Sequence, residues 1–444
     1  MKKLLFIFLL APFLSKSQST IITSSDRGVF DLQNKVVTIT GILSGITLKN
    51  AILNENPYIQ LFDTTVILEG CTAKEFSTAW YGANKNKADN WKELQLSFDA
   101  CLNNKFPTLY IADSYTISKQ WKMANLSKNS YIGWSLHVKG DGNIWNDRTK
   151  ITYTGTSYAL GLQCAKGVII EGIAIKGNYS APTNEGMSYY NTNFPVQSYN
   201  AGIMIDFDGS KNTSGSTGVK IQNCWVDGFD VCYDISPNGK TFNADIITLE
   251  DIRVGNCRIG VRSGQAQEKG NEIRNIVAWD RCQILIQIGK SGKYQAGSYI
   301  IRGGNIAGNV VQLFDVQCSG WNKFIVYGMD AESIARIGFF GSSTSQHRIP
   351  ILIEGLTARL KTKQFTGEQT IVTSQADRLR FSNCNIWYYG VVGDFIRLTG
   401  KGVYDNCDFG ASRIKTDYST FTGNILGIYY LPLNTVLGKP YFQY

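Results

Sequence analysis

Charged residues are scarce in this chain, and proline and histidine are scarcer still. Only 18% of the 444 residues are Asp, Glu, Lys or Arg, there are 9 prolines, and His137 and His347 are the only histidines. The net charge of +9 is spread along the chain without a run rich in Lys and Arg, which argues against nucleic acid as a partner. There is no CxxC pair or cysteine–histidine cluster, so the sequence predicts no metal site of that kind.

Long apolar runs are also missing, apart from one at the N-terminus. Lys2 and Lys3 precede an apolar core from Leu4 to Leu14, and small residues follow at Ser15 and Ser17. This pattern predicts a cleavable signal peptide over residues 1–17 and a secreted, periplasmic or cell-surface protein. The core is too short to span a bilayer and no other segment approaches 18 apolar residues, so no membrane span is expected.

What the chain does contain is a repeat. Runs of alternating apolar and polar residues end in Asn, Asp or Gly, and after a first interval of 51 residues the marks recur every 23 to 28 residues. The marks are Gly172, Asn223, Asp251, Asn275, Gly303, Gly328, Gly355, Asn383 and Asn406. A fixed period of this length indicates stacked structural repeats. The leucine skeleton and helix of leucine-rich repeats are absent.

Three short strands fit within each repeat, because runs of four to six β-forming residues are broken by Gly and Asn. The sequence therefore predicts an all-β fold, a right-handed parallel β-helix with one repeat per coil. Residues 18–72 are predicted to be a small β-rich segment, residues 73–410 the β-helix, and residues 411–444 a C-terminal cap or association segment. The aromatic C-terminus favours self-association, and a homotrimer is one expected form.

A single helix is predicted at residues 90–103. Asn90 and Glu93 have the spacing of a capping box, and an apolar stripe at helical spacing follows. A β-helix exposes apolar core at its open end, so we expect this helix to cover the first coil.

Ten cysteines are present, and Cys224, Cys384 and Cys407 each follow the marked Asn of their repeat. These cysteines occupy equivalent positions on different coils, where small apolar side chains can stack in a column inside the β-helix. Most cysteines are therefore predicted to be reduced and buried, although an oxidising compartment leaves disulfides open.

The region before the repeats resembles the opening of the pectate-lyase-like superfamily. Trp80-Tyr81-Gly82-Ala83-Asn84 is similar to its Asp/Asn–Phe/Tyr–Gly–Ala turn, and a helix and the strands Leu109-Tyr110-Ile111 and Tyr115-Thr116-Ile117 follow. The resemblance covers about residues 78–409. It implies a right-handed parallel β-helix, and the superfamily includes polygalacturonases, polysaccharide lyases and phage tailspikes. The usual Gly-Asp-Gly is replaced by residues 84–87, and the Pro and Gly of the strand pair by Ala112 and Ser114.

Charged side chains converge on three successive repeats. Aligning the second run of each repeat gives an outward ladder of Asp206, Asp234, Arg262 and Gln287, with Asp208 two positions beyond the first and Asp230 aligned with Arg258. Equivalent residues on neighbouring coils lie about 4.8 Å apart. Adjacent carboxylates can separate their pKa values into an acid and a base, and Arg can act beside a uronate. The predicted catalytic residues are Asp206, Asp230, Asp234, Arg258 and Arg262.

Carboxylates of such a cluster can also hold Ca²⁺, although no cofactor is required by the pattern. Asn223-Cys224…Asp230-Val231-Cys232 is similar to the Asn-Cys…Asp-Asp-Cys segment of polygalacturonases, with Val231 in place of the second Asp, and no Gly-His-Gly is present. An ion-pair ladder that neutralises itself without chemistry is the alternative.

The first interval is long because residues 178–200 are inserted, and this insertion is rich in aromatic residues. Insertions in solenoids emerge as loops, often on the functional face, where aromatic rings can stack on sugars. Packing on the coil itself is the alternative. The predicted substrate-binding residues are Tyr179, Tyr189, Tyr190, Phe194, Tyr199, Asp208 and Gln287.

These patterns predict an exported carbohydrate-active protein that cleaves a polysaccharide, either acidic or neutral, as a lyase or a glycoside hydrolase. A glycan-binding module without catalysis, like a tailspike or surface adhesin, is one alternative. A purely structural surface solenoid is another, since a fold does not fix a function.

Overall fold

In the computed structural model, the described residues are 19–124, 135–182, 194, 196, 200–208, 215–235, 244–264, 269–289, 298–307, 310–317, 323–341, 350–361, 368–376, 378–389, 395–416, 419–422 and 426–429. The predicted signal peptide lies outside this part of the chain. So do residues 430–444, which carry several of the C-terminal aromatic residues behind the homotrimer prediction.

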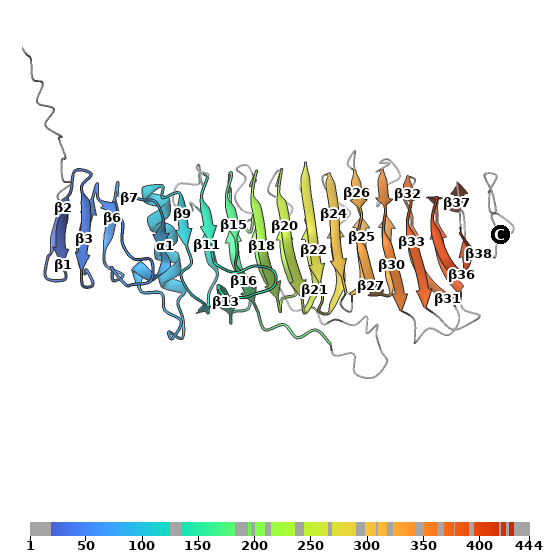
Figure 1. Cartoon of the computed structure of the whole chain (residues 1–444), viewed down its shortest axis with the longest axis horizontal. Helices are drawn as coiled ribbons and strands as arrows, with labels where there is room; N and C mark the ends of the chain where they lie inside the picture. Colours follow the sequence, from blue (N-terminus) through green and yellow to red (C-terminus); the bar gives the residue numbers. More distant parts are fainter. Residues whose placement is uncertain are drawn as a thin grey trace, which may run out of the picture.

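The chain forms one elongated stack of strands that lie across its long axis (Figure 1). Every pairing between named strands is parallel, and each strand pairs with its equivalent one coil away, which defines a parallel β-helix and confirms the predicted fold. One continuous hydrophobic core runs inside the stack from Ile22 to Phe421. The strands of the main stack form three sheets.

The first sheet contains β8 (Phe76–Ser77), β9 (Thr108–Tyr110), β12 (His137–Lys139), β15 (Ile169–Glu171), the first halves of β18 (Lys220–Asp227), β20 (Thr248–Gly255), β22 (Asn271–Ala278) and β24 (Tyr299–Ile306), and then β26 (Phe324–Tyr327), β29 (Ile351–Glu354), β32 (Leu379–Ser382), β35 (Gly402–Asp405) and β37 (Ser419–Thr422).

The second sheet contains β10 (Tyr115–Ile117), β13 (Lys150–Tyr153), β16 (Ala174–Lys176), the second halves of β18, β20, β22 and β24, and then β27 (Asp330–Ile334), β30 (Thr357–Lys361), β33 (Asn385–Tyr389) and the start of β36 (Asp408–Thr416).

The third sheet contains β11 (Trp121–Met123), β14 (Tyr158–Leu162), β17 (Ala201–Ile205), β19 (Val231–Ile235), β21 (Cys257–Ser263), β23 (Cys282–Ile288), β25 (Val310–Gln317), β28 (Arg336–Gly341), β31 (Glu368–Ser374), β34 (Phe395–Gly400), the end of β36, and β38 (Leu426–Tyr429).

The bend between the first and second sheets is a single residue. All nine residues marked by the sequence repeat occupy it, and all nine have a positive φ, between 48° and 69°. Gly, Asn and Asp adopt this left-handed conformation at least cost, which explains the composition of the marks. On either side of the bend the apolar positions point inward, as in the buried column of Ile221, Leu249 and Ile273.

Two smaller parallel sheets precede the main stack. One contains β1 (Thr20–Thr23), β3 (Val36–Thr40), β5 (Ile52–Leu53) and β7 (Thr72–Ala73), and the other contains β2 (Gly28–Asp31), β4 (Ile46–Lys49) and β6 (Ile67–Glu69). The segment is β-rich, as predicted. Its apolar residues belong to the same core as the main stack.

The predicted helix is α1 (Trp91–Asn104), which follows the short 3-10 helix η1 (Thr78–Tyr81). The indole of Trp91 donates to Gln120 O of the main stack (2.7 Å), while Asn104 Nδ2 donates to Leu68 O of the N-terminal segment (3.1 Å). The helix therefore lies between the two stacks and not at an open end (Figure 1).

The predicted capping box at Asn90 is wrong. The Asn90 side chain makes no hydrogen bond to the helix and instead holds the preceding turn, accepting from Asn84 N at 2.7 Å. Asp89 takes the capping role, because its Oδ1 accepts from Trp91 N at 3.0 Å. Glu93 forms an ion pair with Lys87 at 2.5 Å.

The coils continue beyond residue 410, where the β-helix was predicted to end. Strands β36 to β38 pair in parallel with the preceding coils. Nine cysteines lie in the described part of the chain, and all nine are buried and free, as predicted. In that same part, no helix combines the length and apolar character that crossing a bilayer requires.

Candidate functional site

The predicted charged ladder lies on the third sheet, but its register differs by two residues from the predicted one. Met204 pairs with Asp234, which pairs with Arg262, which pairs with Gln287. Met204 therefore occupies the position predicted for Asp206 and packs in a small apolar cluster with Val231 and Ile259. Asp234, Arg262 and Gln287 are confirmed as neighbours in the ladder. The predicted placement of Asp206 beside Asp234 is wrong.

Asp206 lies after the end of β17, where a φ of 58° turns the chain. It is fully buried, and its carboxylate accepts hydrogen bonds from Ser216 N (2.8 Å), Ser216 Oγ (2.7 Å) and Cys164 N (3.3 Å). Burial raises the pKa of Asp206, although these donors favour the charged form. The side chain thus holds two turns together, away from the ladder.

Two buried ion pairs connect neighbouring coils of the third sheet. Arg258 binds Asp230 through Nε and Nη2, both at 2.7 Å, and Arg262 binds Asp234 in the same way at 2.9 and 2.5 Å. Asp230 is only 4% exposed and Asp234 is fully buried. Both oxygens of each carboxylate are occupied by a guanidinium, an arrangement that favours a structural role. Catalysis by these residues stays a prediction.

The predicted substrate-binding aromatic residues are buried where the structure describes them. Tyr179 and Phe194 pack with Val311 and Ala335, which belong to coils further along the stack. Figure 1 shows the green segment after β16 extending along the axis of the stack. This packing leaves neither ring free to stack on a sugar. Tyr189, Tyr190 and Tyr199 lie outside the described residues.

The remaining two predicted binding residues are also engaged in the fold. Asp208 is half-buried, and its backbone N–H donates to Gln163 Oε1 at 2.7 Å. Gln287 is buried, and its Nε2 donates to Asp315 Oδ2 at 2.7 Å, which extends the ladder by one coil.

A different face of the β-helix combines exposed aromatic rings with charged side chains. In the coil of β12 and β13, residues 140–149 replace the single-residue bend and extend over the second sheet. Trp145 from this loop contacts Trp279 with ring centroids 4.5 Å apart, and Ile144 O accepts from Arg253 Nη1 at 3.5 Å. Trp145 is 53% exposed and Trp279 is 44% exposed. We call Trp145, Lys176, Trp225, Arg253 and Trp279 the tryptophan patch.

The cations of the patch lie against its rings. The Arg253 guanidinium is 4.0 Å from the Trp225 ring centroid and 5.8 Å from that of Trp279, and Lys176 Nζ is 4.1 Å from the Trp225 centroid. Such contacts fix the orientation of both partners. Trp225 Nε1 and Arg253 Nε are shielded from solvent and have no hydrogen-bond partner among the described residues.

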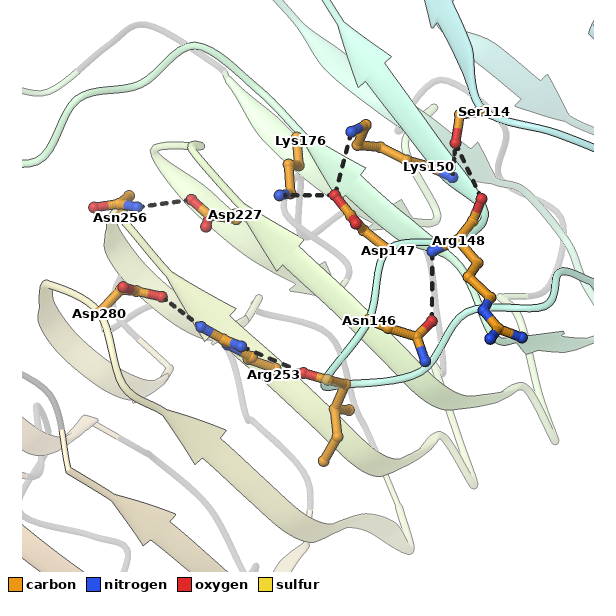
Figure 2. Close-up of polar contacts among 11 residues, drawn as sticks. Ser114, Asn146, Asp147, Arg148, Lys150, Lys176, Asp227, Arg253, Asn256 and Asp280 are labelled. Atoms are coloured by element: carbon orange, nitrogen blue, oxygen red, sulfur yellow. Dashed lines mark hydrogen bonds and ion pairs between the residues drawn. The ribbon is translucent and has the colours of Figure 1, made fainter. Parts of the chain in front are cut away.

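Three carboxylates, those of Asp147, Asp227 and Asp280, lie near Lys176 and Arg253 of the patch (Figure 2). Asp147 accepts from Lys176 (3.1 Å) and Lys150 (3.2 Å), and the Lys176 contact lowers its pKa. Asp227 accepts from Asn256 Nδ2 at 3.0 Å, and Asp280 accepts from Arg253 Nη2 at 3.0 Å.

Asp227 and Asp280 lie on either side of Gly255. Gly255 is the register partner of Asp227, and a Cβ added to Gly255 would lie 2.7 Å from Asp280 Oδ2. Because Gly255 has no side chain, it leaves space for the side chain of Asp280. Burial raises the pKa of Asp227, and the charge of Asp280 raises it further, although Asn256, Lys176 and Arg253 oppose both effects. One carboxyl group thus holds a proton more readily, while the other is bound to a guanidinium.

The site predicted from the sequence does not include this patch. One sequence feature could have identified the patch, namely the residues that lie a fixed distance after the marked residue of each repeat. Asp227 and Gly255 both lie four positions after their mark, and so does Trp279. The contact between Trp145 and Trp279 joins residues that are far apart in the sequence, and no local pattern reveals it.

No metal site is found in the described part of the chain, where no group of three His, Cys, Asp or Glu side chains could hold an ion. The Asp230 and Asp234 carboxylates, which were candidates for Ca²⁺, each face a guanidinium instead.

No family model and no curated protein matches this sequence. Solved structures do match. The Agl-KA catalytic domain superposes with a TM-score of 0.54 at 15% identity, over 82% of this chain and 68% of that one. The A-module of the mannuronan C-5 epimerase AlgE6 of Azotobacter vinelandii superposes with a TM-score of 0.51 at 11% sequence identity, over 82% of this chain and 98% of that one. A variant of the catalytic domain of a GH87 α-1,3-glucanase, in complex with nigerose, superposes with a TM-score of 0.50 at 14% sequence identity, over 81% of this chain and 68% of that one.

These likenesses show the fold. The chain is a parallel β-helix, as the resemblance to the pectate-lyase-like superfamily implied.

Proposed function

We propose that this protein binds a polysaccharide across the tryptophan patch and hydrolyses it with Asp227 and Asp280. The observation that carries the proposal is the unlike environment of these two carboxyl groups beside two exposed indole rings. Aromatic faces provide apolar surface for the C–H faces of sugar rings, and paired carboxyl groups with separated pKa values provide an acid and a base. The β-helix neighbours support it, since they include an α-1,3-glucanase and a mannuronan C-5 epimerase.

In this mechanism, Asp227 is the general acid and Asp280 the general base. Protonated Asp227 donates its proton to the glycosidic oxygen as the bond from that oxygen to the anomeric carbon breaks. Asp280 takes a proton from a water molecule, whose oxygen forms the new bond to the anomeric carbon. Arg253 orients the Asp280 carboxylate through its hydrogen bond.

The backbones of Asp227 and Asp280 are separated by two coil spacings, which amounts to about 10 Å, and the Asp280 side chain leans back over Gly255. In the proposed mechanism, a water molecule activated by Asp280 attacks the anomeric carbon directly, so the reaction inverts the anomeric configuration.

A lyase reaction finds less support. Arg258, one of the two arginines predicted from the sequence to be catalytic, is almost fully buried and binds both oxygens of the Asp230 carboxylate. It cannot reach a uronate without breaking that pair.

Glycan binding without cleavage is the second candidate function. It is favoured by the exposed pair Trp145 and Trp279, which can stack on sugars whether or not a bond is broken. In either case we propose that the protein acts outside the cytoplasm, because residues 1–17 have the pattern of a signal peptide.

The test measures reducing-end release from a panel of neutral and acidic polysaccharides, with absorbance of unsaturated uronates recorded in parallel. The proposal predicts new reducing ends without absorbance, and their loss in Asp227→Asn and Asp280→Asn. Absorbance in the products would establish a lyase. Retention on a polysaccharide gel without any product would establish binding alone.

A further inference from the structure

A pocket separate from the tryptophan patch lies beside α1, at the corner where the first two coils of the main stack turn from the second to the third sheet. Its volume is about 740 Å³, within the range of pockets that enclose small ligands. One wall is α1, and the other walls are the turns that follow β10 and β13. The lining residues are Trp91, Gln95, Asp99, Leu102, Asn103, Ser118, Lys119, Gln120, Lys122, Ala124, Tyr153, Gly155, Thr156 and Ser157.

The polar groups on the helix side are held in place before any ligand binds. Gln95 Oε1 accepts from Lys122 N at 3.1 Å and its Nε2 donates to Lys122 O at 3.0 Å. The same Nε2 donates to Asp99 Oδ1 at 3.1 Å, which orients the carboxyl group. The indole of Trp91 is fixed by its hydrogen bond to Gln120 O, and Lys119 Nζ lies 4.8 Å from its ring centroid.

The opposite wall is equally well defined. Ser157 N donates to the Tyr153 hydroxyl at 3.1 Å, so the turn folds back on its own strand. A Cβ added to Gly155 would lie within 2.6 Å of Ser118 O, so only glycine allows the two turns to approach this closely. The close approach sets the width of the pocket between the turns and the helix.

We propose that this pocket binds a single sugar residue of a glycan. Its lining combines apolar surface from Trp91 and Leu102 with a carboxylate, amides, hydroxyls and ammonium groups, and a sugar ring offers an apolar C–H face and several hydroxyls. Gln95 orients the Asp99 carboxyl group, which is placed to bind hydroxyls, and Lys119 and Lys122 provide donors at the rim.

The pocket is distinct from the tryptophan patch and does not depend on the proposed reaction. It lies at the same corner of the solenoid, two coils before Asp227, which corresponds to about 10 Å along the axis. A glycan that occupies the pocket can therefore extend toward the patch.

The experiment is saturation-transfer NMR on the full chain with D-glucose, D-mannose, D-galactose and D-glucuronate as probes. Thr156→Trp fills the pocket from an exposed rim position, and Thr154→Trp, from the same turn but outside the lining, is the matched control. Asp99→Asn is the second test, and Trp279→Ala removes the exposed indole of the patch.

We expect transfer to at least one probe in the wild type, in Thr154→Trp and in Trp279→Ala. Combined with Trp279→Ala, Thr156→Trp abolishes it, and Asp99→Asn weakens the affinity about tenfold, as for the loss of one hydrogen bond to a charged group. Absence of transfer to every probe, or transfer unchanged when Thr156→Trp is combined with Trp279→Ala, overturns the proposal. A signal lost only in Trp279→Ala assigns the binding to the patch instead, and reducing-end release by the same proteins tests the patch independently.

Discussion

Arg253 donates a hydrogen bond of 3.0 Å from Nη2 to Oδ2 of Asp280, which lies on the next coil of the stack. The same guanidinium lies against the Trp225 ring, 4.0 Å from its centroid, so the cation is fixed from two sides. This arrangement fixes the orientation of the Asp280 carboxylate. Asp227, whose pKa is raised by burial, is the neighbouring group suited to carry a proton.

The first prediction concerns catalysis. Replacing Asp227 or Asp280 by Asn should lower turnover by about two decades or more, the usual effect of removing an acid or base group. Asp147→Asn is the matched control, because Asp147 also borders the patch but is bound to two lysines. Initial rates of reducing-end release measure the effect. Equal losses in all three variants would point to an electrostatic effect of the patch and against the acid/base assignment.

The second prediction concerns pH and stability. Because the folded-state pKa of Asp227 lies above its unfolded value, this group favours the folded state fully below about pH 3.8 and loses that contribution as the pH rises through the folded pKa. Asp227→Asn removes the buried charge while its side-chain oxygen can still accept from Asn256. We therefore expect this variant to melt higher than the wild type at pH 7 and to differ little at pH 3. A lower Tm at pH 7 would contradict the assigned pKa direction.

The repeat was predictable because the single-residue bend selects its own residue types. A left-handed conformation at nine equivalent positions leaves Gly, Asn and Asp, and these letters repeat visibly in the sequence. The strand register was harder. Val231–Ile235 is apolar apart from Asp234, and Ala201–Ile205 is apolar apart from Gly202, without a clear alternation. An alignment shifted by two residues therefore places similar side chains inside.

The site was less predictable than the fold, for a physical reason. Burial of the Asp230 and Asp234 carboxylates depends on what covers the third sheet, and coverage by distant segments leaves no local signal. The tryptophan patch depends on a loop that replaces a one-residue bend and reaches coils much later in the chain, as Trp145 does when it contacts Trp279.

The third prediction concerns glycan binding by the patch. Trp279→Ala or Trp145→Ala should weaken retention on the polysaccharide, with a loss of about 0.5–1.5 kcal/mol for one stacking contact, or about two- to tenfold in Kd. Trp387→Ala is the control, since Trp387 is 36% exposed on β33, well away from the patch. Affinity electrophoresis measures the retention. Weaker binding in Trp387→Ala alone would place the glycan elsewhere on the solenoid.

The fourth prediction concerns the bend. Asn275 has a φ of 58°, and its Nδ2 donates to Asp251 Oδ1 on the preceding coil at 2.7 Å. Asn275→Ala should destabilise the protein by about 1–2 kcal/mol, the cost of holding an L side chain in this conformation. Asn275→Gly keeps the conformation accessible and should cost less, and the order of the two melting temperatures is the measurement. Equal losses would mean that the hydrogen bond, and not the backbone, sets the residue type.

The fifth prediction separates a structural from a catalytic role for the buried pair of Asp230 and Arg258. Arg258→Ala leaves the Asp230 carboxylate buried without its partner, and this should cost about 3–5 kcal/mol. Replacing both residues, as in Asp230→Leu with Arg258→Met, removes the uncompensated charge and should restore most of the lost stability. Thermal melting and reducing-end release are measured on the same preparations. If the double variant melts like the wild type and retains activity, the pair serves the fold. If Arg258→Ala melts normally but loses turnover by two decades, the catalytic role predicted from the sequence is correct and the assignment to Asp227 and Asp280 has to be abandoned.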